Sequence, residues 1–329
     1  MRRHAQRVVM LALLCPAIAN AQAPPAGPAW ASPRTSDGQP DLEGTWTNAT
    51  ITPLERPRAL AGKAFLTEAE AAAFEKQVAE QRERLDTAGT LDSGSYNQFW
   101  YDAGTTVLST RQTSLVVDPP DGQVPVRRSA EARRDDYAAR STDSCEFMSV
   151  WDRCITRGIP GSMFPAGYNN AYQIIQTPGY VTIVYEMIHD ARIIPLDNRP
   201  PPPPRVQTWM GESRGRWDGN TLVIETTNFN DKGWITTSAA SGRIKGIPHT
   251  DKLRVTERLT RISRDEISYS ATIEDPDIYT RPWTVAFPLT SEPDYRMYEY
   301  ACHEGNYSIE NILRGARAQE KAAAAKPPQ

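Results

Sequence analysis

The sequence lacks the short motifs that identify several common classes of enzyme. Its 329 residues contain no Gly-x-Ser-x-Gly nucleophile elbow, no His-Glu-x-x-His zinc motif, no phosphate-binding loop and no dinucleotide-binding fingerprint. Cys-x-x-Cys-His is also missing, and this excludes covalently attached haem. We therefore predict that the protein works without an organic cofactor.

The sequence also has little net charge and no long apolar run beyond its N-terminus, and each of these shortages excludes a class of partner or location. The formal net charge is only −3 and no part of the chain resembles a phosphate-binding surface, so nucleic acid is not an expected partner. Beyond the N-terminus, no apolar run reaches the ~20 residues that a membrane-spanning helix needs. With 39% hydrophobic residues and 27 prolines, the composition fits a loop-rich, exported β protein.

The N-terminus has the layout of a signal peptide over residues 1–21. An apolar stretch separates a basic start from the small-residue cleavage site Ala19-Asn20-Ala21. A lipoprotein alternative at Cys15 is open, although Leu14 stands where a small residue is usual. Residues 22–40 are rich in proline, alanine and glycine and are expected to form a mobile leader. We therefore predict a periplasmic or secreted protein.

Three cysteines remain in the predicted mature chain: Cys145, Cys154 and Cys302. In an exported protein an odd number predicts one disulfide and one free thiol. We favour Cys154–Cys302, because the alternative, Cys145–Cys154, closes a short loop that constrains the unfolded chain less. A catalytic role for a cysteine is a further alternative.

Runs of alternating and β-branched residues, separated by short turns, predict an antiparallel sheet without βαβ alternation. The fold class that we predict is mainly β: an antiparallel meander β-barrel with a few peripheral helices, since closure removes exposed strand edges. A capping box at Thr67–Glu70 predicts a helix to Arg84, and a second helix is expected over 309–320. Residues 41–320 are thus predicted to form a single β-barrel domain, followed by a disordered tail over 321–329. The predicted strands are 107–117, 171–176, 180–188, 209–217, 221–229, 252–262, 266–274, 281–287 and 295–301.

Two histidines end predicted strands, and each has an acidic neighbour. His189 closes an apolar strand face and precedes Asp190, while His303 precedes Glu304. Two such strand ends, meeting at one mouth of a barrel, would make a catalytic site in which His189 transfers a proton and Asp190 orients it. Alternatively, each histidine only bonds a backbone carbonyl or a carboxylate. His249 lies in a loop and is expected at the surface.

A further catalytic candidate is Glu257, which shares a strand face with apolar neighbours. A carboxylate on the core side is costly unless it is paired, hydrogen-bonded or neutralised. It would act as a general base with a raised pKa, or it would form a structural ion pair with an arginine such as Arg111 or Arg281. No metal site is predicted, although a divalent metal held by His189, His303 and a carboxylate is a weaker alternative.

Candidates for binding a substrate come from both polar and charged residues. Arginine inside a barrel can hold a carboxylate or carbonyl oxygen through two bonds, a role expected of Arg111 or Arg192. Tyr168 and Asn170 precede a strand and would donate hydrogen bonds at the rim, and Glu304 would assist His303. The alternatives are arginines that face solvent and turn or cap roles for Tyr168 and Asn170.

Several motifs resemble a family of exported bacterial proteins that occurs in many copies in soil and aquatic bacteria. They include HDARIIPLD from His189, SRGRW from Ser213 and EYACHEGNY from Glu299. The resemblance covers nearly the whole predicted mature chain and implies no particular activity. The segment around Cys145 and the proline run Pro200–Pro204, expected to be a stiff spacer, depart from the family pattern.

The sequence Gly44-Thr45-Trp46 resembles the first strand of lipocalin-like (calycin) barrels, in which the tryptophan plugs one end. The alternative is a tryptophan that is simply buried on a first strand. This second resemblance again implies a barrel.

Hypotheses from three classes follow. The first is an exported enzyme that uses acid–base chemistry, as a lyase, isomerase or hydrolase, on a small, partly apolar organic molecule in a barrel pocket. The second is a lipocalin-like carrier that binds a small molecule without catalysis, and the third is a structural envelope protein. The barrel interior distinguishes them: converging histidine, glutamate and arginine favour the enzyme, an apolar cup the carrier, and a filled core the structural protein.

Overall fold

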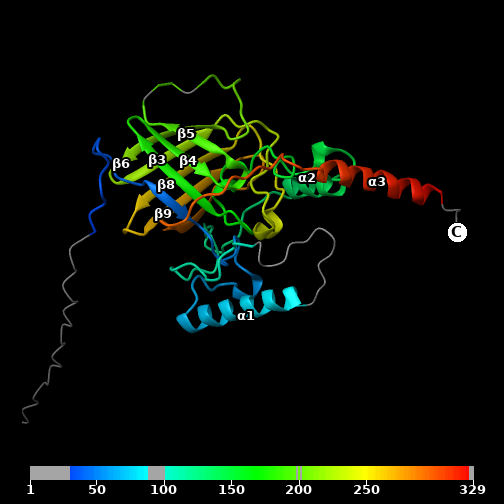
Figure 1. Ribbon diagram of the computed structural model, residues 1–329, viewed down its shortest axis with the longest axis horizontal. Coiled ribbons are helices and arrows are strands. Elements are labelled where there is room, and N and C mark those ends of the chain that lie inside the picture. Colours follow the sequence, from blue (N-terminus) through cyan, green and yellow to red (C-terminus); the bar gives the residue numbers. More distant parts are fainter. Residues whose placement is uncertain (1–29, 88–100, 198, 201, 326–329) are drawn as a thin grey trace, which may run out of the picture. The chain divides into compact units, whose positions relative to one another are not determined.

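The chain folds around one antiparallel sheet (Figure 1). The structure is a computed structural model that describes residues 30–87, 101–197, 199–200 and 202–325. The predicted signal peptide and the first part of the predicted leader lie outside the described residues. From Ser32 onward the chain forms one compact unit.

Nine strands follow one another round the sheet in the order β5-β4-β3-β1-β10-β9-β8-β7-β6, and β2 pairs with β10 outside this path. The first strand closes the meander, because β1 pairs with both β3 and β10. The predicted antiparallel meander β-barrel is therefore confirmed. The strands are β1 (Gly44–Thr47), β2 (Val116–Asp118), β3 (Ala171–Thr177), β4 (Tyr180–Tyr185), β5 (Ala191–Pro195), β6 (Glu212–Asp218), β7 (Thr221–Thr227), β8 (Arg254–Arg261), β9 (Glu266–Glu274) and β10 (Trp283–Ser291).

The barrel is nearly closed, and its two end strands meet at a seam between β5 and β6. These strands are neighbours in space, yet β5 has its ladder only with β4, and β6 only with β7. Gly215 of β6 makes the close approach possible. A Cβ at this position would lie 2.7 Å from Leu196 Cδ2 and 2.9 Å from Ile194 Cγ2. Side-chain packing, rather than backbone hydrogen bonds, therefore closes the seam.

The inner face of the sheet is filled by large side chains. Residues alternate between the two faces of a strand, and eleven inward residues of β8, β9 and β10 are at most 3% exposed. All but Glu257 are apolar or aromatic, so their burial supplies much of the stability of the fold. These inward residues are Val255, Glu257, Leu259, Ile267, Tyr269, Ala271, Ile273, Trp283, Val285, Phe287 and Leu289.

The turn residues in the sequence predicted the positions of the hairpins correctly. Pro178 and Gly179 turn the chain between β3 and β4, and residues 263–265 join β8 to β9. Gly219, between β6 and β7, has a φ of 60°, a conformation that glycine adopts without steric cost. The positions of these hairpins therefore followed from the sequence.

Two predicted strands are wrong. In the range 107–117 only β2 forms, because the backbone of Arg111 turns with a φ of 56° and Thr113 and Leu115 donate hydrogen bonds to Ala64 and Pro53 instead of to a strand. The range 295–301 has no ladder at all. Alternating sequence is therefore not enough for a strand, which also needs a partner strand to pair with.

The helices lie outside the barrel (Figure 1). The predicted capping box starts α1 (Glu68–Thr87): Glu70 N donates to Thr67 Oγ1 over 3.3 Å, and Thr67 N donates to Glu70 Oε2 over 2.9 Å. α2 (Arg128–Ala139) and α3 (Ser308–Ala324) follow, and α3 extends into the predicted disordered tail. No helix in the described part of the chain is long and apolar enough to cross a bilayer.

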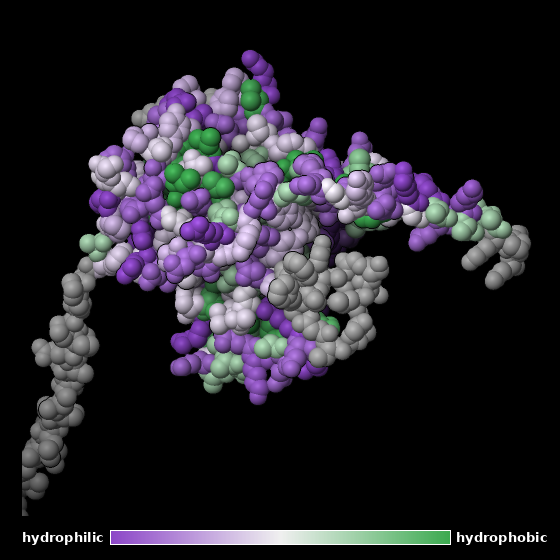
Figure 2. Space-filling view, viewed as in Figure 1, coloured by the Kyte–Doolittle hydropathy of each residue, from purple (hydrophilic) through white to green (hydrophobic). Residues whose placement is uncertain are grey.

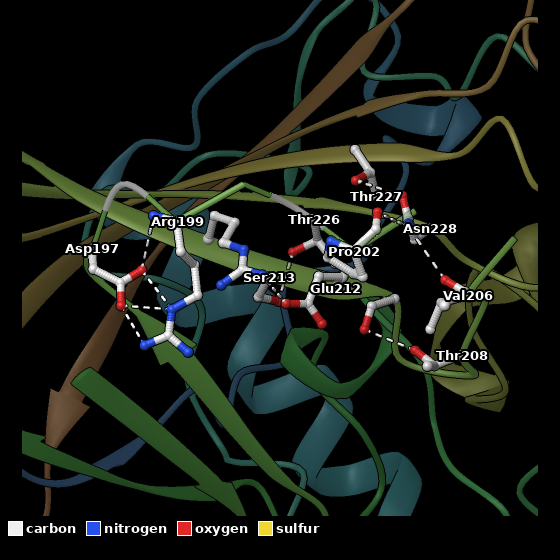
Figure 3. A network of polar contacts seen from close by, with 12 residues as sticks. Asp197, Arg199, Pro202, Val206, Thr208, Glu212, Ser213, Thr226, Thr227 and Asn228 are labelled. Carbon is white, nitrogen blue, oxygen red and sulfur yellow. Dashed lines mark hydrogen bonds and ion pairs between the residues drawn. The ribbon is translucent and has the colours of Figure 1, made fainter. Parts of the chain in front are cut away.

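The proline-rich connection from β5 to β6 is fastened by one asparagine (Figure 3). Asn228, which has a φ of 57°, donates from its amide to Pro202 O over 3.3 Å and to Val206 O over 3.2 Å. At the start of the connection Arg199 Nε donates to Asp197 over 2.8 Å. Residues 198 and 201 of the predicted polyproline spacer lie outside the described residues.

The outer face of the barrel carries one row of exposed apolar residues. Ile175 of β3 and Ile193 of β5 flank Thr182 of β4 in register, and Ile193 is 63% exposed. Figure 2 shows this green surface over β3–β5 amid mainly hydrophilic residues. Most of the outer surface in this view is hydrophilic, whereas the inner face is apolar. This difference is the alternation that a barrel strand requires.

Trp46 is buried at one end of the barrel. Its Nε1 donates to Leu42 O over 3.0 Å, and the guanidinium of Arg261 lies 5.3 Å from the centre of its ring. Earlier in the chain, Arg34 and Pro40 form an isolated bridge, so part of the predicted leader folds back on itself.

Candidate functional site

The turn that carries His189 differs from the prediction. β4 ends at Tyr185, and Ile188 and His189 then take left-handed backbone conformations with φ values of 61° and 47°. This turn ends the strand alternation, so His189 leaves the apolar face and is exposed. Its Nδ1 lies 2.6 Å from Tyr300 O. The contact is the backbone hydrogen bond that the alternative interpretation describes.

His303 and Glu304 are also exposed, in a turn rather than at a strand end. The chain segments that carry the two histidines do meet, since Tyr300 contacts His189 and the disulfide Cys154–Cys302 holds the later segment in place. The predicted disulfide is thus confirmed, and Cys145 is free and exposed. Neither histidine lines any of the three cavities described below.

Glu257 and Arg192 form an ion pair inside the barrel. Arg192 Nη1 lies 2.7 Å from Glu257 Oε2 and its Nη2 lies 3.2 Å from Oε1, with side chains 4% and 0% exposed. Tyr269 donates its hydroxyl to Glu257 Oε1 over 3.0 Å. The ion-pair alternative is confirmed, although the partner is Arg192, which the sequence suggested as a substrate-binding residue, and not Arg111 or Arg281.

The other predicted residues are dispersed. Asp190 is half-buried and accepts a hydrogen bond from Thr156 Oγ1 over 2.7 Å, and burial raises the pKa of its carboxyl. Asn170 is buried and serves the local backbone, with Oδ1 accepting from Ala166 N over 2.8 Å. Arg111 is exposed. These side chains do not converge on one point.

His249 is buried, whereas a position at the surface was expected from the sequence. It is 1% exposed and its ring meets Phe229 edge to face at 5.4 Å. Burial lowers the pKa of its imidazole, partly offset by the Thr250 carbonyl, which lies 3.2 Å from Nδ1. Gly233 packs directly on the ring: a Cβ there would lie 2.1 Å from Nε2.

Tyr168 is the predicted site residue that borders open space. It lines a cavity of about 510 Å³, which we call the Arg157 cavity. Its walls are mainly apolar and aromatic, with the rings of Trp151 and Tyr168 6.2 Å apart. The residues around it are Val78, Gln81, Arg82, Leu85, Tyr101, Ala103, Trp151, Arg157, Ala166, Gly167, Tyr168, Met187, Thr237, Ser238, Ala239, Ala240 and Lys245.

Two further cavities adjoin the Arg157 cavity. The larger, about 870 Å³, shares the walls of Trp151, Tyr168 and Lys245 and reaches α3 at Ile309 and Ile312. A smaller one of about 270 Å³ shares Arg82, among others. The three cavities share lining residues and lie beside the loop 150–168, which the disulfide at Cys154 holds in place.

Arg157 and Thr237 stand out among the lining residues because their polar atoms lack partners. Arg157 is 3% exposed, and its Nε and Nη2 are buried without a hydrogen-bond acceptor. Thr237 is 1% exposed, and its Oγ1 is also buried without a partner. Unsatisfied buried polar atoms are rare in native proteins and mark sites that require an explanation.

Neither Arg157 nor Thr237 was predicted as a site residue from the sequence. The one pattern that could have indicated Arg157 is the run Ile155-Thr156-Arg157-Gly158-Ile159, in which an arginine lies between two isoleucines close to the disulfide at Cys154. Among the described residues, no group of three or more histidine, cysteine, aspartate or glutamate side chains is placed to hold a metal ion.

Comparisons with known proteins do not extend this picture. No protein-family model, no curated protein and no solved structure matches the chain. The family resemblance and the lipocalin-like resemblance therefore stay predictions.

Proposed function

We propose that the protein binds a small, partly apolar organic molecule in the Arg157 cavity. The cavity itself supports this proposal: its volume of about 510 Å³ falls in the range of small-molecule sites, ~300–1,000 Å³. Aromatic and aliphatic walls combined with a few polar groups are also typical of such sites. Trp151, Tyr168 and Met187 supply the apolar surface, while Arg157 and Thr237 supply the polar groups.

The location separates this proposal from a lipocalin-like carrier with its ligand inside the barrel. Inward side chains, including the Arg192–Glu257 pair, occupy the inner face. The Arg157 cavity is instead lined by α1 and by loops, and binding residues commonly stand on loops that a rigid scaffold positions. Of the three classes of hypothesis, binding of a small molecule is best supported, with the site moved from the barrel interior to its loops.

Acid–base catalysis is a second proposal, and Asp190 is the residue that favours it. Burial raises the pKa of its carboxyl, and the backbone N–H of Arg157 is one of its hydrogen-bond donors. A general base directly behind the cavity wall would be the starting point for chemistry on the bound molecule. If so, Asp190→Asn abolishes turnover of a substrate but not its binding; unchanged turnover would exclude Asp190 as the base.

Cavity filling tests the binding proposal. Ala240 is an exposed lining residue, so Ala240→Phe occupies the cavity at little cost to the fold. We expect saturation-transfer NMR with the neutral probes indole and p-cresol to detect binding to the wild type and to the control Ala322→Phe on α3, but not to Ala240→Phe. Equal signals from both variants, or none from the wild type, would refute the proposed site.

We propose further that the chain is exported and that the segment 1–21 is removed. The disulfide Cys154–Cys302 supports export, because such bonds persist in oxidising compartments. N-terminal sequencing of the protein from fractionated cells is expected to start at Gln22; a start at Met1 in the cytoplasmic fraction would contradict export.

A further inference from the structure

The charge around the Arg157 cavity has one sign. Arg82, Arg157 and Lys245 line it, and none of its described lining residues is an aspartate or a glutamate. This imbalance is local, because the chain as a whole has a formal net charge of −3. A concave surface with cationic groups alone attracts and retains an anion.

Of these cations, Arg157 is the one whose buried charge has no carboxylate partner among the described residues. The ionisable groups that influence it are the phenols of Tyr172, Tyr168 and Tyr300, and the burial of Tyr172 raises the pKa of that phenol, so it is neutral at ordinary pH. Burial in turn lowers the pKa of Arg157. A buried charge is normally paired, and no described carboxylate pairs with Arg157, which favours an anion that binds from outside the chain.

The atoms without partners have the geometry of a carboxylate site. Nε and Nη2 lie on one edge of the guanidinium, and two parallel N–H groups on such an edge match the two oxygens of a carboxylate. Thr237 Oγ1, buried and also without a partner in the same cavity, offers a hydroxyl donor. The other walls, such as Trp151, Tyr168 and Met187, are apolar or aromatic.

We infer that the ligand of the Arg157 cavity is a small organic monocarboxylate with an aromatic or aliphatic body, whose carboxylate is held by Arg157. The inference rests on the proposed function and narrows it to a chemical class. Of the three cations that line the cavity, Arg157 is the one with buried N–H groups that lack an acceptor, and this single fork matches one carboxylate. A phosphonate probe tests whether Arg82 and Lys245 add the charge that a dianion would need.

Matched probes test this assignment: 3-phenylpropionate, its neutral amide and a phosphonate of the same length, titrated by calorimetry at pH 7. We expect the wild type to bind the carboxylate about tenfold or more tightly than the amide, since hydrogen bonds to a charged group contribute more than neutral ones. Arg157→Met should abolish this preference and leave the affinity for the amide unchanged. Arg157→Lys should keep part of it, because lysine presents one point charge.

Arg153→Met is the matched control, since Arg153 lies in the same loop but does not line the cavity. It should keep the wild-type preference. Thermal unfolding checks the fold: removal of an unpaired buried charge is expected to leave the midpoint of Arg157→Met unchanged or raised. A large fall in that midpoint would make Arg157 a structural residue and overturn the inference.

The outcomes separate the inference from the proposed function. If the amide binds as tightly as the carboxylate, or if Arg157→Met keeps the preference, the assignment of a carboxylate to Arg157 is wrong while the cavity remains a binding site. Tighter binding of the phosphonate would likewise overturn the assignment to monocarboxylates. If no probe binds the wild type and indole and p-cresol also fail, the proposed function itself falls.

Discussion

Replacing Glu257 by glutamine would leave the guanidinium of Arg192 without a counter-charge inside the barrel. The pair is fully desolvated, with side chains 4% and 0% exposed, and two hydrogen bonds of 2.7 and 3.2 Å join its members. Breaking a buried ion pair on one side commonly costs about 3–5 kcal/mol, because a buried charge is left unpaired. We expect Glu257→Gln and Arg192→Met each to lower the free energy of unfolding by this amount.

The assay is urea unfolding followed by tryptophan fluorescence, with the double variant completing a cycle. Arg192→Met combined with Glu257→Gln buries no charge and keeps an acceptor for Tyr269, so a coupling of about 1–3 kcal/mol is expected. Asp118→Asn is the control, since the ion pair of Asp118 with Arg281 is about half exposed and should contribute less than ~1 kcal/mol. A loss in Glu257→Gln no larger than in Asp118→Asn, or strictly additive losses in the double variant, would refute the reasoning.

Three further predictions concern other parts of the fold. Cys302→Ser opens a loop of 148 residues and should lower the free energy of unfolding by about 4 kcal/mol; an equal loss in the wild type under reducing conditions is the check, and an unchanged urea midpoint in either would contradict it. Thr67→Ala removes the cap of α1 and should cost about 1 kcal/mol, measured by faster amide exchange in α1; unaltered exchange would show that the cap is dispensable. Because burial lowers the pKa of His249, the unfolded state binds more protons below pH ~6.5, so stability should fall as the pH drops from there through the folded pKa, by up to ~1.4 kcal/mol per pH unit. His249→Gln should lack this slope between pH 5 and 7, and a wild-type slope in the variant would assign the effect elsewhere.

Local signals predicted the parts of the fold that depend on local chemistry. The hairpin β8–β9 followed from alternation over 252–274 and a short polar turn, and α1 followed from the capping box at Thr67. The ranges 107–117 and 295–301 have similar alternation, yet the first is used mainly as a loop and the second pairs with no strand. A strand depends on its neighbour, and the neighbour is a long-range property that alternation does not report.

In the candidate site, too, features that depend on local sequence were easier to predict than features that depend on long-range packing. Tyr168 was chosen because it precedes a strand, and it lines the Arg157 cavity. The disulfide was predicted because the alternative pairing closes only a short loop. The position of His189 was predicted wrongly because Ile188 and His189 take left-handed backbone conformations. Such a conformation is rare for a β-branched residue such as isoleucine, so the sequence favoured a continued strand. Arg157 was missed because its importance lies in what surrounds it: a buried guanidinium with no acceptor is a feature of three-dimensional packing and leaves almost no trace in the sequence.

The seam between β5 and β6 gives this barrel a freedom that fully hydrogen-bonded barrels lack. In a closed ladder, strand number, tilt and shear are linked, so a one-residue shift of any strand must be absorbed round the whole circumference. Here β5 and β6 each have a ladder on one side only. An insertion, deletion or shift in register at either strand therefore stops at the seam, where side-chain packing around Gly215 resists it and no ladder does. Variation in strand length should accordingly be tolerated at these two strands and not at β9, whose ladders with β8 and β10 run along nearly its whole length.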